Sequence, residues 1–302
     1  MARSQRSYTG WLFALPALFF LLVWLVYPTL WTINASFYTG NGFNLTRFVG
    51  LDNYTRLFTL DPYFFNNSTF PPTGTAVNNV IWLVVFTTLV ILFGLLIAAL
   101  AEKVRYEAAL KAIVFLPYAI SATAAGIIWL FMYDPGIGLV NALLGAIIPG
   151  WQPLSFTGDQ RFVTISIIIA AVWIQTGFTT VVISAALKGI SADIIEAARV
   201  DGANPIQIFT RIQVPMISAT ISVLVVTMII FVIKVFDLIL IMGGQLGGPQ
   251  GSARVIAFTQ YIETFQNGKL GYGSAIAMIM MILVLPIIIY NLRQFRREEA
   301  LR

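Results

Sequence analysis

Long apolar segments that lack charge constrain the fold of this chain more than any other feature. Six of them reach about 18 residues or more, the length at which an apolar run is typical of a membrane-spanning helix. At about 1.5 Å per residue, each can cross a hydrocarbon core about 30 Å thick. The sequence therefore predicts an all-α, polytopic membrane protein with one transmembrane domain over residues 1–302. The predicted spans are residues 11–36, 76–101, 108–133, 162–187, 216–242 and 272–292.

Composition supports a membrane location and removes several kinds of chemistry. Hydrophobic residues make up 58% of the chain and charged residues 10%, against about 45–50% and 25% in soluble domains. The chain has no cysteine and no histidine. This excludes disulfides, thiolate nucleophiles and metal sites built on those side chains, so no metal site is predicted.

The basic residues are distributed unevenly between the loops on the two sides. Twelve lie on the side that holds both ends of the chain and the segment 188–215, and five lie on the other. Because basic loops stay in the cytoplasm, both termini are expected there. The net charge of +5 is therefore a topology signal, and no nucleic-acid partner is predicted.

The segment 188–215 is predicted to fold as two short helices. Ser191 is a good N-cap, and Gly202 is placed to end the first helix in a left-handed conformation. Asn204 and Pro205 restart a helix as N-cap and first helical residue. The apolar sides are predicted from Ile190, Ile194 and Ala198 in the first helix and Ile206, Phe209 and Ile212 in the second.

Two roles fit such a segment. An amphipathic helix can lie against lipid headgroups, but its polar face is then mainly basic. Here Asp193, Glu196 and Asp201 accompany Arg199 and Arg211. Mixed charge around small residues favours docking into a protein groove.

The same segment resembles the signature loop of membrane subunits of ATP-driven importers. The signature is Glu-Ala-Ala, three residues, Gly, nine residues, Ile, one residue, Leu-Pro. This chain has it at Glu196, Ala197, Ala198, Gly202, Ile212 and Pro215, with Val214 in place of Leu, and Asp201 also resembles the sugar-importer version. The resemblance implies the permease subunit of a type I ATP-binding cassette (ABC) importer in a prokaryotic inner membrane.

Partners and cofactors follow from this resemblance and not from the sequence pattern. It implies that the segment is a coupling helix that docks on a separate ATPase dimer, which binds ATP and magnesium. It also implies a second permease subunit, usually a different chain, an extracytoplasmic solute-binding protein and surrounding membrane lipid. This chain would bind no cofactor itself.

Three outer segments extend the resemblance to carbohydrate permeases of the maltose and glycerol-phosphate type. They are residues 48–54, the glycine-rich stretch 243–249 and residues 270–275. The implied function is one half of a pathway for a sugar or oligosaccharide, with an α-glucoside among the candidates. The solute itself stays open, and glycerol phosphate is among the alternatives.

Charges deep in the membrane are confined to the fifth predicted span. Lys234 and Asp237 are three residues apart, which in a helix places them on one face, close enough to pair. They form either a structural ion pair or part of the solute path. Gln175, Trp173 and Trp129 are weaker candidates for the path. Gly94, Gly126 and Gly177 are predicted to permit close helix packing.

The sequence lacks the motifs of a catalyst. The glycine-rich stretch has no Gly-Lys-Ser/Thr ending, so no phosphate-binding loop is predicted, and no nucleophile–base set lies in the spans. An ion-coupled secondary transporter remains the alternative. It predicts more intramembrane carboxylates and inverted repeats.

Overall fold

A computed structural model of the chain describes residues 8–41, 44–66 and 73–300. Four helical stretches in it are long and apolar enough to cross a membrane, and two further pairs of helices are bent at a short break. Counted as one span each, the bent pairs bring the total up to the predicted six. The second pair, Pro205–Met216 with Ser218–Lys234, differs in its bounds from the predicted fifth span, because it begins inside the segment 188–215. The described chain divides into two compact units, Met1–Leu60 with Thr259–Ile282, and Asp61–Phe258 with Leu283–Arg302.

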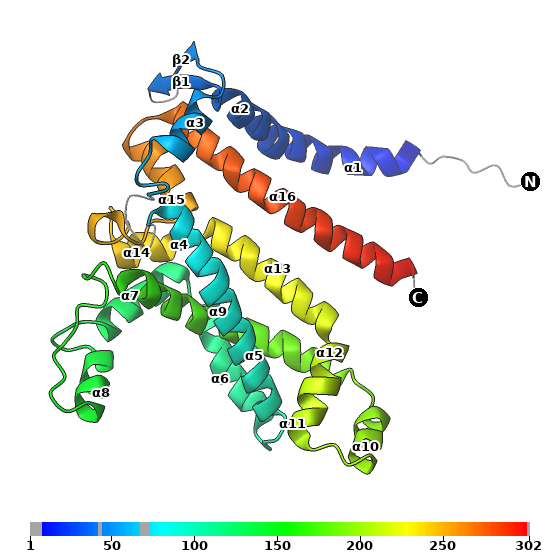
Figure 1. Cartoon of the computed structure of the whole chain (residues 1–302). Helices are drawn as coiled ribbons and strands as arrows, with labels where there is room; N and C mark the ends of the chain where they lie inside the picture. Colours follow the sequence, from blue (N-terminus) through cyan, green and yellow to red (C-terminus); the bar gives the residue numbers. More distant parts are fainter. Residues whose placement is uncertain (1–7, 42–43, 67–72, 301–302) are drawn as a thin grey trace, which may run out of the picture. The chain divides into compact units, whose positions relative to one another are not determined.

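The first unit contains the first span, a small hairpin and the start of the last span (Figure 1). The hairpin was not predicted, and its strands pair antiparallel with a bulge between Thr39 and Gly40. Asn53 fastens it, because its side-chain amide donates to the carbonyls of Ser36 at 2.8 Å and Tyr38 at 2.9 Å. The elements are α1 (Tyr8–Leu21), η1 (Leu22–Val26), α2 (Tyr27–Ala35), β1 (Tyr38–Asn41), β2 (Asn44–Phe48), α3 (Asp52–Thr59), η5 (Ile262–Gln266) and α16 (Leu270–Ala300).

The segment 270–275, which resembles carbohydrate permeases, contacts the hairpin and α3 inside this unit. The Arg56 guanidinium, on α3, lies 5.1 Å from the ring centre of Tyr272. A Cβ atom at Gly271 would overlap the Tyr38 carbonyl, so the helix start needs a glycine there. Sequence elements far apart in the chain thus pack together in this unit.

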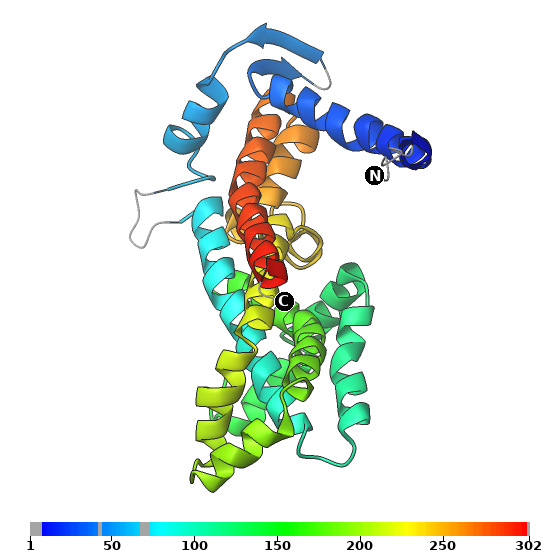
Figure 2. The same cartoon turned by 90° about the vertical axis from the view of Figure 1, so that its right-hand side faces the viewer.

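The second unit is a helical bundle, with α9 at its centre (Figures 1 and 2). α9 packs against both α5 and α6, and α7 packs against α14. The elements are α4 (Thr75–Ile81), η2 (Trp82–Phe86), α5 (Thr87–Ala101), α6 (Glu107–Ala119), α7 (Ala122–Met132), α8 (Leu139–Ile147), α9 (Val163–Lys188), α10 (Ala192–Val200), α11 (Pro205–Ile208), η3 (Phe209–Gln213), α12 (Val214–Met216), α13 (Ser218–Lys234), α14 (Asp237–Gly243), η4 (Pro249–Gly251) and α15 (Ile256–Tyr261).

The predicted third span is not one continuous helix. Its two parts, α6 and α7, are bent by 101°. Ile120 and Ser121 have extended backbone between them, and Ser121 caps α7 by accepting the Ala124 amide proton at 3.2 Å. The apolar pattern alone could not show this break, because the pattern continues through it.

The predicted fifth span is also interrupted. α13 ends at Lys234, and Val235 and Phe236 have non-helical backbone before α14 begins. The break removes the helical partner of the Val232 carbonyl, which instead accepts a bond from the buried Asn79 amide at 3.4 Å. Asn79 also accepts the Ile256 amide proton at 2.7 Å, so one side chain supports two irregular segments.

Glycines allow the helices of the bundle to approach closely, as predicted. A Cβ atom at Gly94 would overlap Thr179, one at Gly126 would meet Ile241 at 2.9 Å, and one at Gly177 would overlap the Val114 carbonyl. Because backbone cannot yield as a flexible side chain can, the α6–α9 contact at Gly177 is the least tolerant of the three.

Gly177→Ala is expected to lower the free energy of unfolding by about 2 kcal/mol, the usual cost of overpacking. Gly145→Ala is the matched control, since a Cβ there would lie 3.8 Å from Trp151, an ordinary contact. Thermal unfolding of the two purified variants in detergent measures the difference. Equal midpoints would show that α6 and α9 are not held at this distance.

Candidate functional site

The segment between α9 and α13 has the local structure that its sequence predicts. The Ser191 hydroxyl accepts the Asp193 amide proton at 3.3 Å and caps α10. Gly202 has φ +83°, the left-handed conformation expected at the end of α10. Asn204 and Gln207 form a reciprocal capping box, with both bonds at 2.9 Å, at the start of α11.

The predicted docking residues are largely exposed on this segment. Glu196, Ala197, Asp201 and Gly202 are exposed, whereas Ala198 is buried. Farther along, Ile212 is half-buried in η3 and Pro215 is exposed in α12.

Two large apolar side chains next to these residues are also exposed. Val200 is 88% exposed and Ile206 is 74% exposed. Ile206 was expected on the apolar side of the second helix, and the buried residue of α11 is Ile208. The spacing of Val200 could have indicated its exposure. On a helix, Val200 lies two residues and therefore about 200° beyond Ala198, which is buried.

A pocket of about 340 Å³ brings together three of the five predicted solute-path residues. Gln175 comes from α9, Lys234 from the end of α13 and Asp237 from the start of α14. Tyr118 lies beside them, its ring stacked on Phe178 at 5.1 Å. The remaining lining residues are Ala122, Thr227, Met228, Ile230, Phe231, Val235, Phe236 and Leu238.

The predicted pairing of Lys234 with Asp237 is wrong. The helix ends between them, so the spacing of three residues does not place them on one helical face. Both side chains are exposed, and within the described ranges no ion pair joins them. Each charge is therefore accessible to water or to a polar solute.

Both helix breaks border this pocket. Tyr118 and Ala122 flank the break between α6 and α7, and Val235 and Phe236 form the break between α13 and α14. Non-helical backbone at membrane depth is tolerated only where it is buried in protein or lines a water-filled cavity. The arrangement favours a hydrated chamber with hydrogen-bonding groups from three helices.

The two predicted tryptophans lie in a separate, mainly apolar pocket of about 480 Å³. Trp129 and Trp173 meet edge to face, with ring centres 6.0 Å apart. Thr176 also lines this pocket, one residue after Gln175 on α9. The structure thus separates the aromatic candidates from the charged ones.

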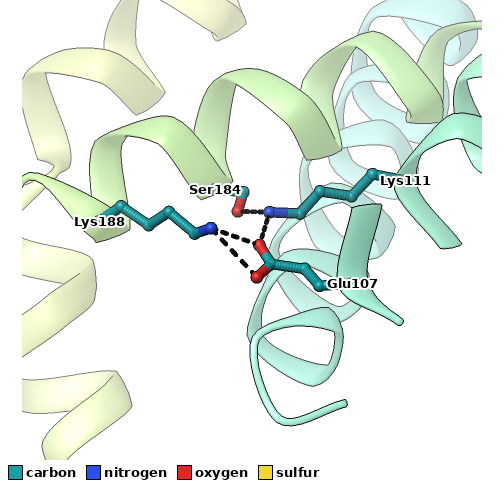
Figure 3. Close-up of polar contacts among 4 residues, drawn as sticks. All are labelled: Glu107, Lys111, Ser184 and Lys188. Atoms are coloured by element: carbon teal, nitrogen blue, oxygen red, sulfur yellow. Dashed lines mark hydrogen bonds and ion pairs between the residues drawn. The ribbon is translucent and has the colours of Figure 1, made fainter. Parts of the chain in front are cut away.

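A cluster of charged residues joins the start of α6 to the end of α9 (Figure 3). Glu107 pairs with Lys111 on its own helix and with Lys188 on α9, where the Lys188 Nζ lies 2.8 Å from Oε1 and 3.0 Å from Oε2. Lys111 also donates to the Ser184 hydroxyl. Partial burial raises the pKa of the neighbouring Glu102, although the positive charge of Lys111 acts to lower it. Sequence reasoning counted these lysines only as topology signals, although the Glu107–Lys111 spacing of four residues is typical of a helical ion pair.

The comparison with known families decides the identity of the chain. Residues 90–297 match the model of the "binding-protein-dependent transport system inner membrane component". The chain belongs to this family. It is therefore a permease subunit of an ABC importer and a multi-pass protein of the inner membrane.

Curated relatives match this permease over nearly its whole length. It is 42% identical to the osmoprotective compounds uptake permease protein GgtC of Synechocystis, over 96% of this chain and 100% of the relative. It is 39% identical to the alpha-glucoside transport system permease protein AglF of Rhizobium meliloti, over 99% of this chain and 85% of the relative.

A solved structure supports the fold. A bacterial alginate ABC transporter, in complex with an alginate-bound periplasmic protein, matches with a TM-score of 0.78 at 24% identity, over 97% of this chain and 96% of that chain. The permease is not a catalyst, because ATP is bound by a separate ATPase subunit of the importer. Family membership also removes the ion-coupled alternative.

Proposed function

We propose that this permease forms half of the translocation pathway for a carbohydrate-like solute, and that the pocket at the two helix breaks is part of that path. The main support is the composition of the pocket, which combines a cation, a carboxylate, an amide and an aromatic face beside the two helix breaks. Sugar hydroxyls can donate to Asp237 and accept from Lys234 and Gln175. The ring of Tyr118 offers a face against which a sugar can stack.

The names of two relatives support a sugar or an osmoprotective compound as the solute. One takes up osmoprotective compounds and another transports alpha-glucosides. Within that class, an α-glucoside is the proposed solute. The unpaired charges of Lys234 and Asp237 fit it because opposite charges in one pocket favour neither an anion nor a cation.

Coupling to the ATPase is proposed to occur through α10 and the turn that follows it. The exposed residues Glu196, Ala197, Asp201 and Gly202 would contact the ATPase cleft, and the exposed Val200 would add apolar area. The buried Ala198 would hold α10 against the permease. Ile212 and Pro215 would fix the segment that leads to α13.

The proposed assembly has a second, different permease subunit as the other half of the pathway. An ATPase dimer binds from the cytoplasm, where both termini of this chain also lie, and a binding protein delivers solute from outside. Residues 1–302 act as one permease domain in this assembly.

The test is uptake by the purified complex in proteoliposomes. With ATP inside and binding protein outside, radiolabelled maltose or trehalose is expected to accumulate about tenfold or more above vesicles that contain a non-hydrolysable ATP analogue. Methionine serves as the control solute. Uptake that prefers methionine, or that proceeds at the same rate without ATP hydrolysis, would contradict the proposal.

A further inference from the structure

The charged cluster at the end of α9 links two helices, α6 and α9, around the carboxylate of Glu107. Glu107 accepts from Lys111 on α6 and from Lys188, the last residue of α9, and Lys111 reaches Ser184 one turn earlier on α9 (Figure 3). Two independent contacts therefore cross from α6 to α9. Removal of the Glu107 charge would leave two lysines facing each other.

The cluster is partly shielded from water. The side chains of Lys111 and Glu107 are 16% and 23% exposed, and that of Lys188 is 57% exposed. A network of partly buried charges fixes the relative position of two helices better than an isolated surface ion pair, which contributes little to stability. Together with the backbone contact at Gly177, the cluster fixes α6 against α9 at two separate levels.

The cluster lies directly next to α10. Only Gly189, Ile190 and the capping Ser191 separate Lys188 from the first residue of α10. This connection is itself hydrogen-bonded, from Gly189 N–H to Ala186 O and from Ile190 N–H to Leu187 O, both at 3.1 Å. A displacement of α10 therefore reaches Lys188 without a flexible linker to absorb it.

The other end of α6 borders the pocket. Tyr118 lies in its last turn, just before the break that leads to α7, and Tyr118 lines the pocket with Lys234 and Asp237. One helix thus connects the charged cluster with the proposed solute path. A shift of α9 that is transmitted through Glu107 would move the Tyr118 face of the pocket.

We propose that Glu107 is a positioning residue that carries the movement of α10 to α6, and through α6 to the pocket. The inference rests on the proposed role of α10 in coupling. In this view α6 and the end of α9 move as one body during the transport cycle. Solute release at the pocket then follows ATP hydrolysis only while the Glu107 contacts are intact.

The first test is Glu107→Gln in the complete importer in proteoliposomes. The ATPase subunits are expected to co-purify as usual, because α10 is untouched. The ratio of solute taken up to ATP hydrolysed is expected to fall about threefold or more. Asp159→Asn is the control, since Asp159 pairs with Arg161 at 2.6 Å within one loop and connects no helices. An unchanged ratio in Glu107→Gln would overturn the proposal.

Exchanging the charges of Glu107 and Lys188 tests whether the contact between the helices matters, or only the presence of a carboxylate at position 107. The double variant Glu107→Lys with Lys188→Glu keeps the net charge and allows the same cross-helix pair in reverse. It is expected to recover at least half of the wild-type ratio, whereas Glu107→Lys alone stays low. If the single and double variants are equally impaired, the contact between the helices is not the cause.

Cross-linking tests the movement directly, because the chain has no cysteine of its own. Lys111→Cys with Ser184→Cys removes two contacts of the cluster, and joining the two thiols with a short bifunctional reagent replaces them by a covalent link. The joined protein is expected to transport with a higher coupling ratio than the same variant without the reagent. Loss of transport on cross-linking, with ATPase binding intact, would show that α6 and α9 must separate and would overturn the proposal. Glu196→Lys separates the proposed coupling role of α10 from the proposed role of Glu107. If Glu196→Lys abolishes ATPase binding while Glu107→Gln leaves the ratio of uptake to ATP hydrolysis unchanged, only the proposal for Glu107 fails.

Discussion

Glu196→Lys is expected to weaken the association of the permease with its ATPase subunits by about 30-fold or more, roughly 2 kcal/mol, the usual cost of reversing one close charge pair at an interface. Glu196 is exposed on α10, and among the described residues it makes no ion pair. The substitution should therefore leave the fold of the permease unchanged. Co-purification of the ATPase with tagged permease, at several salt concentrations, measures the effect.

Lys103→Glu is the control for that experiment, because it reverses an exposed charge in the other proposed cytoplasmic loop. A second comparison uses Gly202, where φ is +83° and no atom lies within 4 Å of an added Cβ. Asp tolerates this backbone better than Ala does, so strain alone would make Gly202→Ala the worse variant. If docking matters, Gly202→Asp is worse. Wild-type association in both Glu196→Lys and Gly202→Asp would contradict the coupling role.

Lys234→Met and Asp237→Asn are each expected to lower solute uptake about tenfold, since a hydrogen bond to a charged group contributes about 1.5–3 kcal/mol. The ATPase is expected to remain bound in both variants. Because the helix break separates the two residues, their effects should add in the double variant. A structural ion pair would behave differently, with the double variant less impaired than the sum of the single ones.

The measurement is solute uptake by the wild type, the two single variants and the double variant, which together form a double-mutant cycle. Uptake is measured at solute concentrations below and above half-saturation. The matched control is the double-mutant cycle of Asp159→Asn and Arg161→Met, which form an ion pair outside the pocket. Its carboxylate stays ionised at physiological pH, because the bonds from Arg161 lower the pKa of Asp159 to about 2. A double variant of Lys234 and Asp237 that transports as well as either single one would assign the two charges to structure and not to the path.

The sequence predicted those parts of the fold whose signals are local. Apolar length gave six candidate spans, of which four are continuous helices in the structure. Ser191, Gly202 and Asn204 marked the helix ends of the α10–α11 segment correctly, since capping depends on residues within one turn. The breaks after Ala119 and Lys234 were missed because hydropathy is the same for a straight and a broken apolar helix. What makes the second break acceptable is Asn79, which is far away in the sequence.

The charged cluster around Glu107 was missed for a related reason. The contact between Glu107 and Lys111 follows from their spacing, but the contacts to Ser184 and Lys188 exist only because Gly177 lets α6 lie against α9. A sequence alone does not show which helices become neighbours. The pocket shows the same limit, since its three polar candidates come from three different helices.

Because the helix is interrupted at Val235 and Phe236, the rotation of α14 about its own axis is not fixed by the rotation of α13. In a continuous helix, one inserted residue would turn every later side chain by about 100° around the axis. Here the orientation of α14 depends on its packing against α7, where Ile241 lies over Gly126. Asp237 can thus be repositioned by changes in that contact while Lys234 stays in place. The two charged sides of the chamber are independently adjustable, which suits a scaffold whose solute range is altered by redesign or by evolution.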